Sequence, residues 1–124
     1  MANKKILIVD DDKFLLDIYS TKFRAAGYAV DIAMNGNEAI EKITASSYAF
    51  ILMDVAMPVL SGFETLEKLK EQKLIGKSPI IMLTNAARPE ELERGEKLGT
   101  KGYVIKSQHT PSEVVKIVEE IVSK

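Results

Sequence analysis

The sequence predicts an α/β fold in which five helices cover both faces of a doubly wound, five-stranded parallel sheet. Short apolar runs recur along the chain, each too brief for a buried helix, and stretches with helical periodicity separate them. Parallel strands need crossover connections, and right-handed crossovers can cover both faces of a sheet. The repeated strand–helix order therefore favours a parallel sheet between two helical layers.

Four of the predicted strands are continuous apolar runs, which are typical of strands buried on both faces. They comprise residues 6–9, 50–53, 80–83 and 103–105. A fifth segment, residues 28–33, alternates apolar and polar side chains more regularly. We expect this strand to be half-covered and nearer an edge of the sheet.

The predicted helices carry their own start signals. Three polar residues stand three positions before a glutamate, the spacing of a capping box: Asn35, Ser61 and Thr110. Pro89 and Pro111 suit the first helical turn, where a missing backbone N–H costs nothing. Asp12 is placed to cap the first helix with its side chain.

Composition limits the classes of function. The 124 residues suffice for about one domain, so residues 1–124 are expected to form a single one. With 17 Lys and Arg against 18 Asp and Glu, the net charge of −1 is too weak for a general polyanion-binding role. We therefore expect neither nucleic acid nor membrane as a partner. The lack of cysteine excludes thiolate metal sites and cysteine nucleophiles, and no apolar stretch approaches the ~20 residues of a membrane span. A cytoplasmic location is expected.

Acidic side chains follow two of the predicted strands. Asp10, Asp11 and Asp12 come directly after the first strand, and Asp54 comes directly after the third. If these strands are neighbours, their acids meet at the carboxyl edge of the sheet, where such folds bind ligands. A hard divalent cation, most naturally Mg²⁺, would relieve the repulsion between them. Because Asp12 is better explained as a helix cap, the metal is assigned to the other three acids.

Two further strand ends contribute a hydroxyl and a cation. Thr84 ends the fourth predicted strand, and Lys106 ends the fifth. Together with acids on the first and third strands, they describe a pocket for a phosphoryl group bridged to Mg²⁺. The negative charge of such a group would be offset by Mg²⁺ on one side and by the lysine ammonium on the other.

At these positions the sequence resembles the receiver domain of two-component response regulators, of the single-domain chemotaxis and phosphorelay type, from Lys4 to Val122. Dispersed motifs agree in order and spacing: Asp10-Asp11, Asp54 followed by Met57-Pro58 and Gly62, Thr84, Tyr103 and Lys106. The resemblance implies a flavodoxin-like fold with the strand order 2-1-3-4-5.

The resemblance also implies the roles of the acidic residues. Asp54 would be the phosphoacceptor and a metal ligand, and Asp11 would be the main ligand of Mg²⁺. Asp10 would contact the metal through water, and the backbone carbonyl of Ala56 would complete the protein's metal contacts. An aspartyl carboxylate is an adequate nucleophile once nearby positive charge offsets that of the phosphoryl group.

A switch is implied at the remaining site residues. Thr84 would bind a phosphoryl oxygen, Lys106 would pair with the phosphate, and Tyr103 would swing inward when Thr84 moves. The phosphoryl donor would be a sensor histidine kinase or a histidine phosphotransfer protein, and a downstream protein target would read the result. Such a protein promotes its own phosphorylation and dephosphorylation but is not a turnover enzyme.

Several positions depart from the usual family pattern. Ser107 follows Lys106 where the family usually has proline, and because a non-proline cis bond costs about 3 kcal/mol we expect a trans peptide and a differently set loop. Asn85 is larger than the usual residue beside Thr84 and would narrow access for phosphodonors. Ala56 and Ala86 cannot orient a hydrolytic water, which predicts a long phosphoryl lifetime.

The first helix suggests where a partner docks. Its apolar residues spread over about 200° of the helix surface, more than one buried stripe requires. With Leu15, Ile18 and Tyr19 near the centre of the buried face, Phe14 and Leu16 lie at its flanks, close to the acids. The resemblance implies that the histidine kinase or phosphotransfer helix docks there.

Two alternative functions belong to other classes of protein. An aspartyl-phosphate hydrolase of the haloacid dehalogenase type would also begin from Asp10-x-Asp12, but Phe14 and the lack of an acid motif soon after Lys106 oppose it. A flavodoxin-like binding module without phosphorylation would need a glycine-rich or hydroxyl-rich phosphate loop where the chain has aspartates. The receiver could stand alone or be part of a longer regulator.

Overall fold

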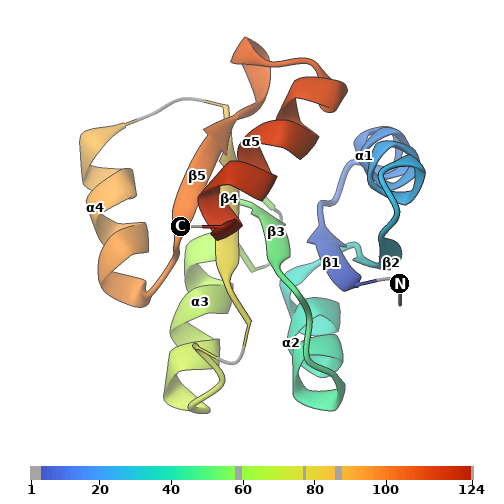
Figure 1. The fold of residues 1–124 in the computed structure, drawn as a ribbon. Helices are drawn as coiled ribbons and strands as arrows, with labels where there is room; N and C mark the ends of the chain where they lie inside the picture. The colour runs from blue at the N-terminus through green and yellow to red at the C-terminus, as the bar shows by residue number, and fades with distance from the viewer. Residues whose placement is uncertain (1–3, 58–59, 77, 86–87, 124) are drawn as a thin grey trace.

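A computed structural model describes residues 4–57, 60–76, 78–85 and 88–123 of the chain. These residues form a parallel sheet with helices on both faces (Figure 1). The elements in order are β1 (Lys5–Val9), α1 (Lys13–Ala25), β2 (Ala29–Ala33), α2 (Gly36–Ala45), β3 (Ile51–Asp54), α3 (Gly62–Glu71), β4 (Ile80–Thr84), α4 (Pro89–Leu98), β5 (Gly102–Ile105), a 3₁₀ turn (Lys106–Gln108) and α5 (Pro111–Ser123). Among the described residues, no helix is both long and apolar enough to cross a bilayer.

The strand order is β2-β1-β3-β4-β5, and every neighbouring pair is parallel. This confirms the predicted fold class and strand order. In the registers of these pairs Val9 lies opposite Met53, Asp54 opposite Leu83, and Thr84 opposite Ile105. The carboxyl ends of four adjacent strands therefore meet at one edge of the sheet.

The core consists of two hydrophobic clusters, one on each face of the sheet. Alternate strand residues such as Leu7 and Met53 pack with the apolar faces of α2 and α3. Their neighbours, such as Ile8 and Leu52, pack with α1 and α5. Because successive strand residues point to opposite faces, continuous apolar runs supply both clusters at once.

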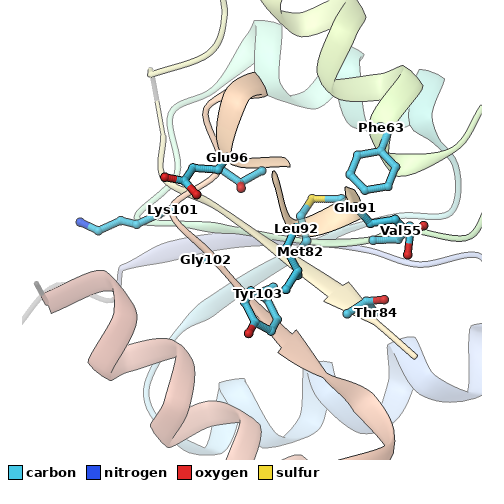
Figure 2. A pocket seen from close by; sticks show the side chains of 11 residues that line it. Val55, Phe63, Met82, Thr84, Glu91, Leu92, Glu96, Lys101, Gly102 and Tyr103 are labelled. Atoms are coloured by element: carbon cyan, nitrogen blue, oxygen red, sulfur yellow. The ribbon is translucent and has the colours of Figure 1, made fainter. Parts of the chain in front are cut away.

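The predicted burial of the last strand is wrong. Strand β5 pairs only with β4, and of its four residues only Val104 is buried. Tyr103 is 42% exposed and lines a cavity of about 360 Å³ together with Met82 and Thr84 (Figure 2). An edge position, which the apolar composition of this short run did not reveal, explains the difference.

The predicted helix starts are confirmed. At Ser61 the full capping box forms: its Oγ accepts from the Glu64 N–H at 3.2 Å, and the Glu64 carboxylate accepts from the Ser61 N–H at 3.0 Å. Thr110 and Glu113 form the same reciprocal pair at the start of α5. The Asn35 side chain caps α2 at 2.9 Å. Each such cap stabilises by about 1 kcal/mol.

The buried face of α1 differs from the prediction. The helix buries Leu16, Tyr19, Ser20 and Phe23, which recur at the spacing of one helical stripe. Leu16 is 1% exposed, so the expectation that it lies at a flank of this face is wrong. The centre of the buried stripe is rotated from its predicted position because α1 packs against both the sheet and α5. Of the two residues predicted at the flanks, only Phe14 is exposed, at 73%.

This difference predicts unequal effects on stability. Leu16→Ala should lower the free energy of unfolding by about 3 kcal/mol, because it opens a cavity in the core. Phe14→Ala removes an exposed ring and should change it by less than about 0.5 kcal/mol. Urea unfolding followed by circular dichroism measures both values. Similar losses in the two variants would contradict the observed orientation of α1.

Candidate functional site

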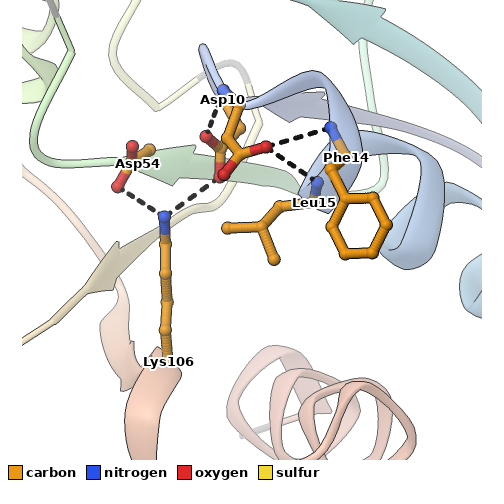
Figure 3. Close-up of polar contacts among 6 residues, drawn as sticks. Asp10, Phe14, Leu15, Asp54 and Lys106 are labelled. Atoms are coloured by element: carbon orange, nitrogen blue, oxygen red, sulfur yellow. Dashed lines mark hydrogen bonds and ion pairs between the residues drawn. The ribbon is translucent and has the colours of Figure 1, made fainter.

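Two acids and a lysine meet at the carboxyl edge of the sheet (Figure 3). Asp10 follows β1 and is 0% exposed, and Asp54 ends β3 and is 4% exposed. The Nζ of Lys106, which follows β5, lies 3.0 Å from Asp10 Oδ2 and 2.9 Å from Asp54 Oδ1. Three residues predicted from separate strand ends thus form one buried, hydrogen-bonded cluster.

The acids predicted to hold a metal are also close together. Asp10, Asp11 and Asp54 each offer a carboxylate oxygen, and these oxygens all lie within 4.8 Å of one another. Asp10 and Asp54 are buried, whereas Asp11 is exposed, so the group is open to solvent on one side. Oxygen donors at this spacing fit a hard divalent cation such as Mg²⁺.

The orientation of the acids is set by local backbone contacts. Asp10 Oδ1 accepts from the Asp12 N–H at 2.9 Å, which leaves Oδ2 for Lys106. Asp12 caps α1 as predicted, since its Oδ1 accepts from the N–H groups of Phe14 and Leu15. Because the Asp12 side chain is engaged in this cap, it is not among the clustered acids.

Burial makes the ionised form of the cluster costly. It raises the pKa of Asp54 to about 6, although the hydrogen bond from Lys106 opposes the shift. Burial also opposes the charged form of Lys106, but its hydrogen bond to Asp54 and the charge of Asp10 keep its pKa above the usual value. The carboxylates outnumber the ammonium group, and an added cation would relieve their repulsion.

Thr84 and Tyr103 lie on the neighbouring strands. Thr84 is the last residue of β4 and is buried. The cavity beside it is lined in part by the apolar side chains of Val55, Phe63 and Leu92, and Tyr103 also lines it (Figure 2). Val55 directly follows Asp54, so the cavity begins one residue from the acid cluster.

The loop after β3 is held close to the sheet by a glycine. A Cβ on Gly62 would lie 2.5 Å from the backbone oxygen of Asp54 and 2.8 Å from the Met82 Cε. Gly62 therefore permits α3 to begin directly against the end of β3. Ala56 is exposed in this loop, and Met57 is buried. The predicted motif residue Pro58 and the predicted Ala86 lie outside the described residues.

The loop after β5 contains a contact that the sequence did not predict. The described residues contain no cis peptide bond, which confirms the expected trans peptide at Ser107. Residues 106–108 form a 3₁₀ turn, and the Ser107 hydroxyl donates to the backbone oxygen of Asn85 at 3.4 Å. No sequence signal links two residues that lie 22 positions apart.

The predicted docking residues are separated by the fold. Phe14 projects from the first turn of α1, next to the acid cluster (Figure 3). Leu16 is in the core and cannot contribute to a surface.

Comparison with known proteins identifies close structural and sequence relatives. Residues 6–119 match the family model described as the response regulator receiver domain. Chemotaxis protein CheY4 of Vibrio cholerae superposes with a TM-score of 0.88 at 32% identity, covering 97% of this chain and 99% of that one. A CheY-like receiver domain protein of Methanospirillum hungatei JF-1 gives 0.87 at 31% identity, covering 98% and 95%.

Among curated proteins, two transcriptional regulators of Bacillus subtilis are similar over nearly the whole chain. The alkaline phosphatase synthesis regulator PhoP is 36% identical over 98% of this chain and 50% of its own length. The regulator ResD is 38% identical over 97% of this chain and 48% of its own length. The chain thus spans about half the length of these two relatives.

Proposed function

Because the chain belongs to the receiver domain family of two-component response regulators, we propose that it accepts a phosphoryl group on the Asp54 carboxylate and changes conformation in response. One observation carries the proposal: Asp54 lies 2.9 Å from the Lys106 ammonium and beside Asp10 and Asp11. The Asp54 carboxylate therefore lies near both the Lys106 ammonium and two further carboxylates that could bind a metal ion.

Receiver domains use Mg²⁺ at an acidic pocket, and the acids of this chain fit such an ion. Asp11 and Asp54 would hold it through carboxylate oxygens, and Asp10, whose carboxylate lies beside theirs, would contact it through water. The resemblance adds the backbone carbonyl of Ala56. When bound, Mg²⁺ supplies positive charge that offsets the negative charge of the phosphoryl oxygens.

The chain's own residues account for the transfer. An Asp54 oxygen forms a bond to phosphorus, and the bond from phosphorus to the donor breaks with its electron pair leaving on the donor. With a phosphohistidine donor that bond is P–N, and with acetyl phosphate it is P–O. Lys106 remains close enough to Asp54 to pair with the transferred group, and its ammonium stabilises the charge that gathers there.

The phosphorylated state would differ through contacts made by Thr84 and Lys106. An acyl phosphate carries about two negative charges, and these attract the Thr84 hydroxyl and the Lys106 ammonium. Movement of Thr84 toward Asp54 would open space beside β4, and the adjacent cavity could then receive the Tyr103 ring. These differential contacts bias two conformations and make the domain a switch.

Response regulators work with histidine kinases and act on downstream targets, and we propose the same classes of partner for this chain. PhoP and ResD are named as transcriptional regulators, but the matched region is only about half of each, so we propose no DNA binding for this chain. The exposed Phe14 ring is proposed as a contact for the phosphohistidine donor.

The proposed function is tested by intact mass after incubation with acetyl phosphate, with Mg²⁺ or with EDTA. We expect a gain of one phosphoryl group only with Mg²⁺. Borohydride reduction converts an aspartyl phosphate to homoserine, so peptide mass spectrometry should find that change at Asp54. A modification at another residue would overturn the assignment. Repeated turnover of small phosphate esters would favour the hydrolase alternative.

The docking role of Phe14 is separable from the chemistry. Phe14→Ala should slow transfer from a phosphorylated histidine phosphotransfer protein by about tenfold, as expected for loss of an exposed aromatic contact in an interface. The rate with acetyl phosphate should not change, because this donor needs no protein surface. Equal rates of transfer from the protein donor to Phe14→Ala and to the native chain would show that Phe14 is not a docking residue.

A long phosphoryl lifetime is also expected. The methyl group of Ala56, exposed in the loop two residues after Asp54, cannot orient a water for attack on the acyl phosphate. After removal of the donor, the phosphorylated mass should therefore decay slowly. A decay as fast as that of chemotaxis-type receivers, measured side by side, would contradict this expectation.

A further inference from the structure

Ser107 connects the two loops that carry the groups expected to bind the phosphoryl oxygens. Its hydroxyl donates to the backbone oxygen of Asn85 at 3.4 Å. Asn85 directly follows Thr84, and Ser107 directly follows Lys106. Thr84 and Ile105 are paired in the parallel register of β4 and β5, so the two loops leave the sheet side by side.

This contact depends on the residue that the chain has at position 107. The family usually has proline here, which offers no hydroxyl group. In this chain the peptide bonds of the described residues are trans, and residues 106–108 form a 3₁₀ turn that brings the Ser107 Oγ to the β4 side. Ser107 and Asn85 are both exposed, so neither contributes to the core.

The sheet order determines what the contact does. Strand β4 lies between β3 and β5, with Asp54 at the end of β3 and Ser107 beyond the end of β5. Thr84 must move toward β3 to reach a phosphoryl group on Asp54. The Ser107 hydroxyl holds the next residue, Asn85, toward β5, which is the opposite direction.

We propose that Ser107 is a positioning residue that restrains the Thr84 loop on the β5 side and so opposes the phosphorylated conformation. This inference rests on the proposed function. A long, exposed hydrogen bond is among the weaker hydrogen bonds in proteins. Its loss should shift the equilibrium between the two conformations about threefold toward the phosphorylated one. By linkage, any ligand that prefers this arrangement should bind tighter by the same factor.

The test uses beryllofluoride with saturating Mg²⁺ as a non-covalent mimic of the phosphoryl group. Its affinity is measured by NMR titration of the full chain. Ser107→Ala should bind it about threefold tighter than the native chain, whereas Ser107→Thr, which keeps the hydroxyl, should match the native affinity. Gln108→Ala, an exposed change in the same turn, is the matched control. In the absence of beryllofluoride, the ¹³C shift of the Asn85 carbonyl should change in Ser107→Ala and stay constant in Gln108→Ala.

The outcomes separate the two proposals. Equal or weaker binding by Ser107→Ala, or failure of Ser107→Thr to restore the native affinity, would overturn the role of Ser107 while leaving Asp54 phosphorylation intact. If the native chain neither binds beryllofluoride nor gains a phosphoryl group, the proposed function itself fails, and the role of Ser107 fails with it.

Discussion

Asp54→Asn is expected to abolish the Mg²⁺-dependent gain of a phosphoryl group and, at the same time, to stabilise the protein. The amide is not a nucleophile for phosphorus, so no acyl phosphate can form. The amide is also uncharged, which removes one of two buried carboxylates that share the Lys106 ammonium. Intact mass measures the first effect, and urea unfolding in EDTA measures the second.

The stability effect has a defined pH dependence. Burial raises the pKa of Asp54 to about 6 in the folded chain, from an ordinary value of 3.8. A raised pKa means that the protonated form contributes stability below the ordinary value, and that this contribution is lost as pH rises through about 6. Compared with the native chain, Asp54→Asn should therefore be more stable by roughly 3 kcal/mol at pH 8, and by much less at pH 4.

Asp17→Asn provides the control for this experiment, because Asp17 is an exposed acid on α1. Its free energy of unfolding should stay close to that of the native chain at both pH values. If Asp54→Asn still gains a phosphoryl group, Asp54 is not the phosphoacceptor. A stability difference independent of pH would show that the charge at Asp54 is not the cause.

Lys106→Met is expected to destabilise the protein strongly in the absence of Mg²⁺. Lys106 donates to Asp10 and Asp54, and both acids are buried. Without the ammonium, two buried carboxylates face each other, and removal of one partner of a buried ion pair costs about 3 kcal/mol or more. The free energy of unfolding should fall by that amount at pH 8.

Two conditions should restore part of this loss. At pH 5, below the raised pKa of about 6 of Asp54, this carboxyl group takes up a proton and no longer repels Asp10, so the variant should approach the native stability. Added Mg²⁺ should stabilise Lys106→Met more than it stabilises the native chain, since the ion would replace the missing charge. Phosphorylation by acetyl phosphate should be slower on the order of 100-fold, the usual effect of removing a preorganised charge-stabilising group.

Lys116→Met is the matched control, because Lys116 is an exposed lysine on α5. It should change neither stability nor phosphorylation. If Lys106→Met unfolds at the same urea concentration as Lys116→Met at pH 8, the ion pairs of Lys106 contribute nothing to the fold, and their role in the site would have to be revised.

Much of the fold was predictable because its signals lie in contiguous residues. The apolar runs predicted the strands, and the capping residues Asn35, Ser61 and Thr110 predicted helix starts that the structure contains. The positions of Asp10 and Asp54 at strand ends predicted that they would meet. Their proximity follows from the rule that the carboxyl ends of neighbouring parallel strands share one edge.

Other features depend on which elements become neighbours in space. The burial of Leu16 is decided by the direction in which α1 packs against the sheet and α5, and the wide apolar surface of α1 allowed more than one choice. The exposure of Tyr103 is decided by the edge position of β5. A short apolar run has the same composition at an edge as at the centre of a sheet.

The sequence by itself determined the elements, their order, and the residue types at the carboxyl edge, since each of these is a property of residues close together along the chain. Only the tertiary structure decided that Lys106 bridges Asp10 and Asp54, and that Ser107 reaches Asn85. The Lys106–Asp10 contact joins residues 96 positions apart, and the Ser107–Asn85 contact joins residues 22 apart. Such contacts form because the sheet brings distant strand ends within hydrogen-bonding distance, and no local pattern encodes that geometry.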